Sequence, residues 1–237
     1  MDAQDQRILQ DMLVRAMAAQ RRETERAAGK PRSLKRILRM AERAILRADQ
    51  NIEQAAELIP PPRSIACQAG CPYCCHIRLT ASPPEILLVL AHIQDTWDAA
   101  QIETLKRKVK NTDAFTRGKS IEERAAQRLP CPLLKDGSCS VHSVRPLSCR
   151  ALASVDVGAC KAAYASRMQN GVPMYEPQHQ IANAVGYGLH AGLTDVGYPL
   201  ENVELVAALA CGLNDPDLGR KWLQGTPILA AATCLDP

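Results

Sequence analysis

Cysteine is the residue type whose number and spacing in this sequence point most directly to chemistry. The chain has 237 residues and 10 cysteines, of which eight fall into two groups. The first group is Cys67, Cys71, Cys74 and Cys75, and the second is Cys131, Cys139, Cys149 and Cys160. Thiolates are soft, strong ligands for zinc and for iron, so two such groups brought together by the fold predict a metal or iron–sulfur site.

The first residues bear on whether these thiols form disulfides or bind metal. The sequence begins Met-Asp-Ala-Gln-Asp-Gln-Arg, which contains no apolar stretch and opens with an acidic rather than a basic residue, so we expect no secretory signal. A chain that is not exported stays in the reducing cytoplasm, where stable disulfides are uncommon and closely spaced cysteines more often bind metal. We therefore expect a cytoplasmic protein with metal-binding thiols.

The spacing of the cysteines favours an iron–sulfur cluster over zinc. Zinc takes four ligands in a tetrahedron, commonly as two pairs with short spacers, whereas a 4Fe–4S cluster takes one thiolate per iron. The spacers of the first group mix three and two residues, no histidine stands at a zinc-finger position, and proline follows both Cys71 and Cys131. We predict a 4Fe–4S cluster, with zinc as the alternative.

The pair Cys74-Cys75 leaves open whether there is one centre or two. Neighbouring side chains of an extended backbone point in opposite directions, so we expect that the two thiols do not ligate the same ion. Cys75 would then serve a second centre or none. Ligation from both groups would close a long loop, so that the binding energy contributes to folding.

Two arginines flank Cys149 and could compensate the negative charge of clustered thiolates. Arg145 and Arg150 are candidates to donate hydrogen bonds to sulfur and so to tune a bound cofactor. The alternative for Arg145 is that it only organises the turn at 144–146. Both interpretations stay open at this stage.

Hydrophobic periodicity predicts a helical arm over residues 1–59. One helix is expected over 1–29 and a second from a capping Ser33 to about Ile59, and Pro60-Pro-Pro62 then forms a stiff linker. The second helix carries a basic face over residues 33–47, formed by Lys35, Arg39, Arg43 and Arg47. Such a stripe is usually a solvated face, and a contact with a protein partner is the alternative.

The remainder, residues 60–237, is predicted to be one helical domain built around the cysteines. Ser82-Pro-Pro-Glu85 predicts the start of a buried core helix, and further helices are expected around Leu105, from Ser120 and over 177–224. Glycine and proline break the cysteine segments into loops. No alternation of strands and helices is visible, so the predicted fold is mostly α, with a loop-built metal site and an N-terminal helical arm.

Composition argues against two classes of partner. The longest apolar stretch, residues 86–91, is too short to span a membrane. The chain has one Phe and two Trp, and its net charge is +4. Since single-stranded nucleic acid is bound largely by aromatic stacking and basic grooves, we expect no membrane contact and no nucleic-acid partner.

The spacing Cys67-x3-Cys71-x2-Cys74, with Tyr73 before the last thiol, is similar to the three-cysteine signature of radical S-adenosylmethionine enzymes. Those enzymes place the signature after the first strand of a βα barrel. This sequence shows neither alternating strands nor a Gly-Gly-Glu-like segment downstream, so we interpret the match as a coincidence of a short pattern.

The two cysteine groups together resemble the YkgJ-type cysteine-cluster family of zinc- or iron-chelating domains. The resemblance covers residues 65–160 and rests on three linked motifs, namely Cys67-x3-Cys71-x2-Cys74-Cys75, Cys131-Pro-Leu-Leu with Gly137-Ser-Cys139-Ser-Val-His142, and Arg145-Pro-Leu-Ser-Cys149-Arg150. It implies that the first seven cysteines of the two groups are the ligand pool and adds Cys160 as a further member. His142 stands where the family commonly has an aromatic residue.

That family includes flagellin lysine methylase-like proteins, so the resemblance also implies a group-transfer enzyme as an alternative function. The chain contains no Gly-rich S-adenosylmethionine loop after a strand. Whether it is an enzyme is left open, and the sequence favours a metal-binding protein acting in redox, electron transfer or metal handling. A zinc-stapled helical interaction module is the other alternative.

Overall fold

A computed structural model describes residues 1–198, 202–227 and 229–232 of the chain. Helices dominate these residues, so the predicted mostly α fold is confirmed. The strands within the described ranges are two residues long and form two antiparallel pairs. Strand β1 (Thr80–Ala81) pairs with β4 (Val203–Glu204), and β2 (Leu134–Lys135) pairs with β3 (Ser138–Cys139).

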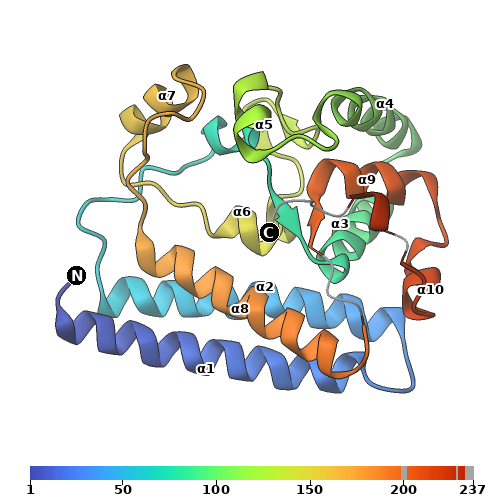
Figure 1. Cartoon of the computed structure of the whole chain (residues 1–237), viewed down its shortest axis with the longest axis horizontal. Coiled ribbons are helices and arrows are strands. Elements are labelled where there is room, and N and C mark those ends of the chain that lie inside the picture. The colour runs from blue at the N-terminus through green and yellow to red at the C-terminus, as the bar shows by residue number, and fades with distance from the viewer. Residues whose placement is uncertain (199–201, 228, 233–237) are drawn as a thin grey trace.

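Three long helices form one layer of the molecule (Figure 1). They are α1 (Ala3–Ala28), α2 (Leu34–Leu58) and α8 (Glu176–Asp195), and each packs against the other two. Asp2 caps α1 by accepting from the backbone N–H groups of Gln4 and Asp5. Ser33 precedes α2 as predicted, although its side chain makes no capping hydrogen bond.

Glycines let α1 and α8 approach each other at backbone distance. A β-carbon on Gly188 would lie 2.3 Å from the carbonyl oxygen of Met17, and one on Gly192 would lie 2.6 Å from that of Arg21. The arm predicted over residues 1–59 is therefore packed against α8, a helix of the domain that was predicted to follow it, and is not separate from that domain. The boundary at Pro60 stays a prediction.

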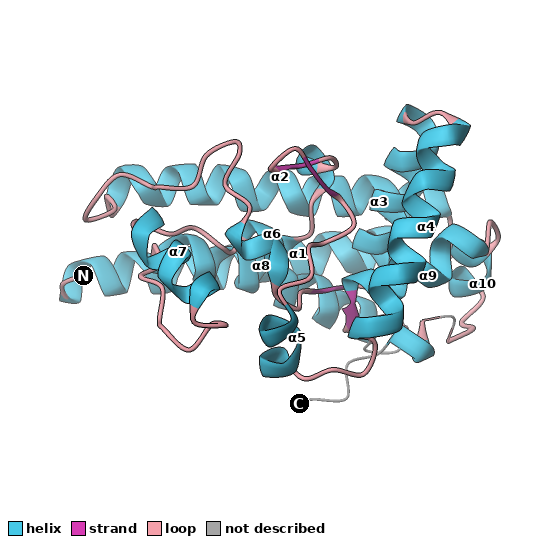
Figure 2. Ribbon diagram, turned by 90° about the horizontal axis from the view of Figure 1, so that it is seen from above, coloured by secondary structure: helices cyan, strands magenta, loops and turns pink. Residues whose placement is uncertain are grey.

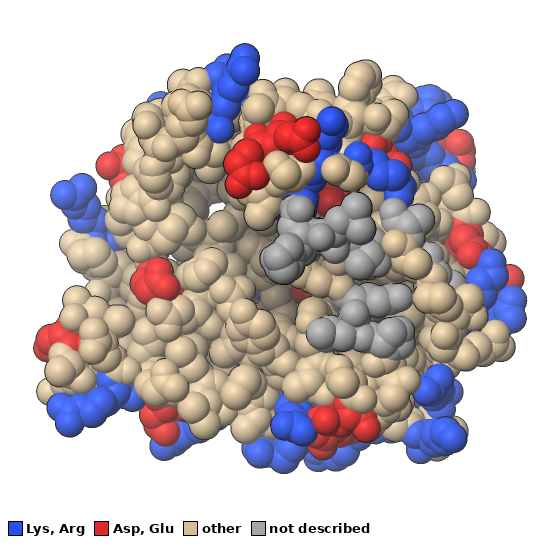
Figure 3. Space-filling model, viewed as in Figure 1, with Lys and Arg blue, Asp and Glu red and all other residues tan. Residues whose placement is uncertain are grey.

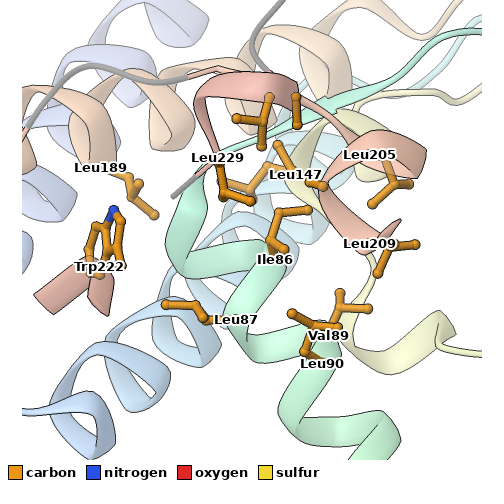
Figure 4. Close-up of a cluster of buried hydrophobic side chains, with 14 of the residues drawn as sticks. Ile86, Leu87, Val89, Leu90, Leu147, Leu189, Leu205, Leu209, Trp222 and Leu229 are labelled. Atoms are coloured by element: carbon orange, nitrogen blue, oxygen red, sulfur yellow. The ribbon is translucent and has the colours of Figure 1, made fainter. Parts of the chain in front are cut away.

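The main hydrophobic core surrounds α3 (Pro83–Thr96), as Figure 4 shows. Ile86, Val89 and Ile93 of this helix are fully buried, and they pack in one cluster with residues of α9 (Leu205–Asn214) and α10 (Leu218–Leu223). Glu85 accepts from the backbone N–H of Ser82, as the predicted capping box requires. Its other oxygen accepts from the backbone N–H of Leu147, so this buried carboxylate also ties the cysteine region to the core.

Three further helices lie on the side of the molecule away from α1 (Figure 1), and Figure 2 shows the molecule from that side. They are α4 (Ala99–Thr116), α5 (Ile121–Gln127) and α7 (Val157–Ala165). Within the stretch 177–224, where helices were predicted, α9 begins only at Leu205, because Val203 and Glu204 pair with β1 instead. Residues 199–201 lie outside the described part.

The cysteine segments were predicted to be loops, and the structure corrects this prediction at two places. Cys74 and Cys75 lie in the 3-10 turn η1 (Tyr73–His76) and not on extended backbone, because the chain closes a hydrogen bond from Cys75 N–H to the Pro72 carbonyl. Cys149 lies on α6 (Leu147–Arg150) and Cys160 on α7, so these two are helical. A second 3-10 turn, η2 (His142–Val144), precedes α6.

Charges of both signs are distributed around the face in Figure 3, with uncharged side chains between them. No helix in the described ranges combines the length and apolarity needed to cross a membrane.

Candidate metal centre

The two cysteine groups meet through their backbones. The N–H of Cys131 donates a 2.7 Å hydrogen bond to the carbonyl oxygen of Cys75, which fixes the start of the second group against the end of the first. A second contact joins the turn at Gly70 to the β2–β3 turn at Gly137. The hairpin then places Cys139 opposite Leu134, close to Cys131.

One cavity, here called cavity B, is lined by thiols of both groups. Its volume is about 70 Å³. The cysteines on its wall are Cys74, Cys75, Cys131, Cys139 and Cys149. Three segments supply them, namely η1, the hairpin with the residues before it, and α6. The fold therefore gathers at one cavity thiols that are far apart in sequence.

A second cavity, here called cavity A, has a volume of about 80 Å³ and is lined by the three remaining thiols of the two groups together with Cys74. Its wall contains Cys67, Cys71, Cys74 and Cys160. The sulfur of Cys67 accepts from the backbone N–H of Ser154 at 3.2 Å, and α7, which carries Cys160, packs against η1. Two methionines, Met168 and Met174, complete the sulfur-rich lining.

The two cavities are neighbours with a common wall. Cys74, Ile77 and Leu152 line both of them. In a 3-10 helix successive side chains are about 120° apart, so Cys74 and Cys75 diverge without pointing in opposite directions. Cys74 borders both cavities and Cys75 borders cavity B. The expectation that the pair does not share an ion stays a prediction, although its premise of an extended backbone was wrong.

Burial raises the pKa of most of these thiols. It is the main cause for Cys67, Cys71, Cys139 and Cys149, and it raises the pKa of Cys131 to about 12. For Cys74 the main cause of the raised pKa is a hydrogen bond with the Cys75 thiol. Because thiolate is the form that ligates metal, a cation bound here would have to displace protons.

The two candidate arginines have different surroundings. Arg145 lines cavity B, and its charge lowers the pKa of Cys139 and opposes the effect of burial there. The guanidinium of Arg150 instead holds both carboxylate oxygens of Asp49 at 2.6 and 2.7 Å and donates to the carbonyl of Ser143 at 2.6 Å. That either arginine binds a cofactor stays a prediction.

Two charged residues on the wall of cavity B were not predicted. Arg124 of α5 is 1% exposed and donates to the carbonyl oxygen of His76, and Glu204 of β4 is also buried. Burial lowers the pKa of Arg124 and raises the pKa of Glu204. Neither residue belongs to one of the cysteine motifs, so the spacing within those motifs gave no indication of them.

The donor set and the unsatisfied donors around it fit a metal centre. All nine cysteines within the described ranges are free thiols, and no histidine is found among the described residues that line either cavity. Arg124 and Arg145 each have a buried Nε without a hydrogen-bond partner, and both line cavity B. Buried donors of this kind suit a negatively charged occupant such as a thiolate-bound metal.

The thiols are not arranged as a finished coordination shell. Within the part of the chain that the structure describes, no three His, Cys, Asp or Glu side chains are placed so that they could hold a metal ion. Binding therefore requires the thiols to move towards a common centre. Cys211 is half-buried against the main core, away from both cavities, and Cys234 lies outside the described residues.

The free thiols, their shared cavities and the buried cationic donors form a cysteine cluster whose donor set fits a chelated metal. Comparison with family models agrees, because residues 66–171 match the CxxCxxCC family, described as a "putative zinc- or iron-chelating domain". This match confirms the resemblance noted from the motifs and extends it past Cys160. No curated protein matches the chain significantly, and no solved structure does so either.

Proposed function

We propose that this chain is a cytosolic metal-binding protein whose thiols hold an iron–sulfur cluster and use it in electron transfer or metal handling. The observation that carries the proposal is cavity B, where five thiols from both motif groups lie beside Arg124 and Arg145. When bound, such a cluster would supply one-electron transfer. The protein itself would provide the thiolate ligands, compensate their negative charge and set how far the cluster is exposed to solvent.

The surroundings of the thiols support iron–sulfur chemistry. A cluster bound by four thiolates carries net negative charge, and nearby cationic hydrogen-bond donors stabilise it and tune its reduction potential. That Arg124 and Arg145 both line cavity B supports this role for them. Cys74, which lines cavity B, is exposed, which would leave the centre close to the surface, where a redox partner can approach.

Anaerobic purification of the full chain tests the proposal. We expect a brown protein with sulfur-to-iron charge-transfer absorption, bound iron and acid-labile sulfide. A Cys131→Ser variant should lose the colour of any cluster in cavity B, since Cys131 lines that cavity. A colourless wild-type protein with stoichiometric zinc would contradict the iron–sulfur assignment and leave a zinc-stapled module, and a metal-free protein would contradict metal binding as a whole.

A groove between α1 and α2 supports a second role, in binding an acidic protein partner. Its volume is about 400 Å³, and its wall carries Arg26, Arg36, Arg39, Arg43 and Arg47 beside Glu23. Glu23 accepts from Arg47 at 2.7 and 3.0 Å and pairs with Arg43 at 3.1 Å. One carboxylate thus offsets part of the charge of five guanidinium groups, so the groove is expected to attract carboxylates.

A labelled poly-glutamate peptide provides a direct probe of this groove. We expect salt-sensitive binding that falls at least tenfold in Arg39→Glu, with metal content unchanged. Arg15→Glu is the matched control, because Arg15 also lies on the arm, at a distance from the groove, where it pairs with Asp11. Equal binding by both variants, or no binding by the wild-type chain, would contradict the proposed partner.

A further inference from the structure

We infer that the chain holds two separate four-thiolate metal centres, one in cavity A and one in cavity B, and not a single centre shared by the two cysteine groups. The inference rests on the proposed metal-binding function and goes beyond it in assigning the number of centres and the ligands of each. It depends on how the eight thiols are distributed between two neighbouring cavities.

The number of thiols is the first argument. Tetrahedral zinc and a 4Fe–4S cluster each take four thiolates. Cavity B has a full set without Cys74, and cavity A has a full set only with it. The assignment that completes both sets gives Cys67, Cys71, Cys74 and Cys160 to cavity A, and Cys75, Cys131, Cys139 and Cys149 to cavity B.

The common wall is the second argument. Three residues line both cavities: Cys74, whose thiol is hydrogen-bonded to that of Cys75, and the apolar Ile77 and Leu152. Away from the Cys74–Cys75 contact, the side chains shared by the two cavities cannot ligate a metal. A single centre that used Cys160 together with Cys149 would have to displace this wall. Two centres leave it in place.

Backbone hydrogen bonds hold each set in its own position. In cavity A, Ala66 and Cys67 are fixed to Ser154, since Ala66 N–H donates to the Ser154 carbonyl at 2.8 Å and Ser154 N–H donates to the Cys67 sulfur. In cavity B, Cys131 is fixed to Cys75 by its N–H. The η1 turn lies between these attachments, and of its two hydrogen-bonded thiols Cys74 reaches both cavities whereas Cys75 reaches only cavity B.

The two cavities also differ in charge. Cavity B is lined by Arg124, Arg145 and Glu204, whereas none of the described residues lining cavity A is charged. Cationic groups close to thiolates stabilise their negative charge and raise the reduction potential of a bound cluster. The cluster in cavity B is therefore expected to have the higher reduction potential. This difference would let a redox titration distinguish the two clusters.

Metal counting on the anaerobically purified full chain tests the inference. We expect about eight irons and eight sulfides per chain if both centres are 4Fe–4S clusters, or about two zinc ions if both are zinc sites. About four irons or one zinc would overturn the two-centre assignment while leaving the proposed metal binding intact. A metal-free chain would overturn both.

Matched serine variants identify the ligands. Cys160→Ser should remove the centre in cavity A and Cys149→Ser the centre in cavity B, each leaving about half of the metal, whereas Cys211→Ser should keep all of it. For two iron–sulfur clusters, redox titration should show two transitions in the wild type and a different single one in each of the first two variants, whereas for two zinc sites the metal content of the three variants is the readout. Two variants that keep the same single transition, or a wild type with one transition and half the metal, would overturn the assignment.

Discussion

Gly137 lies against Gly70 so closely that a β-carbon on Gly137 would be 3.3 Å from both the α-carbon and the carbonyl oxygen of Gly70. Both glycines have positive φ, +76° and +87°, which L side chains rarely adopt. The contact joins the loop that carries Cys71 to the hairpin turn just before Cys139. Two glycines thus allow the two cysteine groups to meet at backbone distance.

Replacement of Gly137 with alanine should weaken this junction. The backbone strain costs about 1 to 3 kcal/mol, and the added methyl group crowds Gly70 as well. We expect a lower melting temperature and loss of bound metal. Gly118→Ala is the control, because Gly118 also has positive φ (+72°) but has no atom within 4 Å of the added β-carbon. If both variants retain metal equally, the close approach has no role in assembling the site.

The close crossing of α1 and α8 predicts opposite effects for two glycines of one helix. Gly188→Ala should destabilise the protein by about 2 kcal/mol or more, since its β-carbon would meet the Met17 carbonyl at 2.3 Å and force the helices apart. Gly186→Ala meets only Leu147, at 3.9 Å, and should stabilise by up to about 1 kcal/mol through helix propensity. Urea unfolding measures both. A neutral Gly188→Ala would show that the helices are not in backbone contact.

Arg150 is expected to stabilise the folded protein through its ion pair with Asp49. Its side chain is 6% exposed and that of Asp49 is 41% exposed, so the ion pair is only partly desolvated. Arg150→Met should cost about 2 to 4 kcal/mol, because it leaves the carboxylate and the Ser143 carbonyl without their donor. Arg150→Lys should recover less than half of this loss, since lysine cannot replace the planar fork. Full recovery by lysine would mean that charge alone matters.

Removal of metal should loosen the cysteine domain more than the layer of long helices. A structural metal site can contribute on the order of 10 kcal/mol to the folded state. We expect chelation to raise amide exchange throughout residues 66–171, whereas α1 and α8, which pack through Gly188 and Gly192, keep most of their protection. Hydrogen exchange followed by mass spectrometry distinguishes the two regions. Uniform exchange in both states would contradict a metal-organised domain.

Sequence alone determined those features that depend on neighbouring residues. The starts of α3 at Ser82 and of α5 at Ser120 were predictable, because Glu85 and Glu123 complete capping boxes within one turn. The cysteine spacings likewise identified the ligand candidates and the family that residues 66–171 match. In each case the signal lies within a short stretch of chain.

Tertiary structure alone decided how the thiols are divided. The hydrogen bond between Cys131 and Cys75, the apolar wall of Ile77 and Leu152, and the presence of Arg124 all join residues distant in sequence. The backbone conformation at Cys74-Cys75 was likewise decided only by the tertiary structure. Gly70 and Pro72 indicate that a helix is interrupted, but they do not indicate which turn replaces it. Periodicity and spacing report local geometry, whereas the distribution of the eight thiols between two cavities depends on packing across the whole chain.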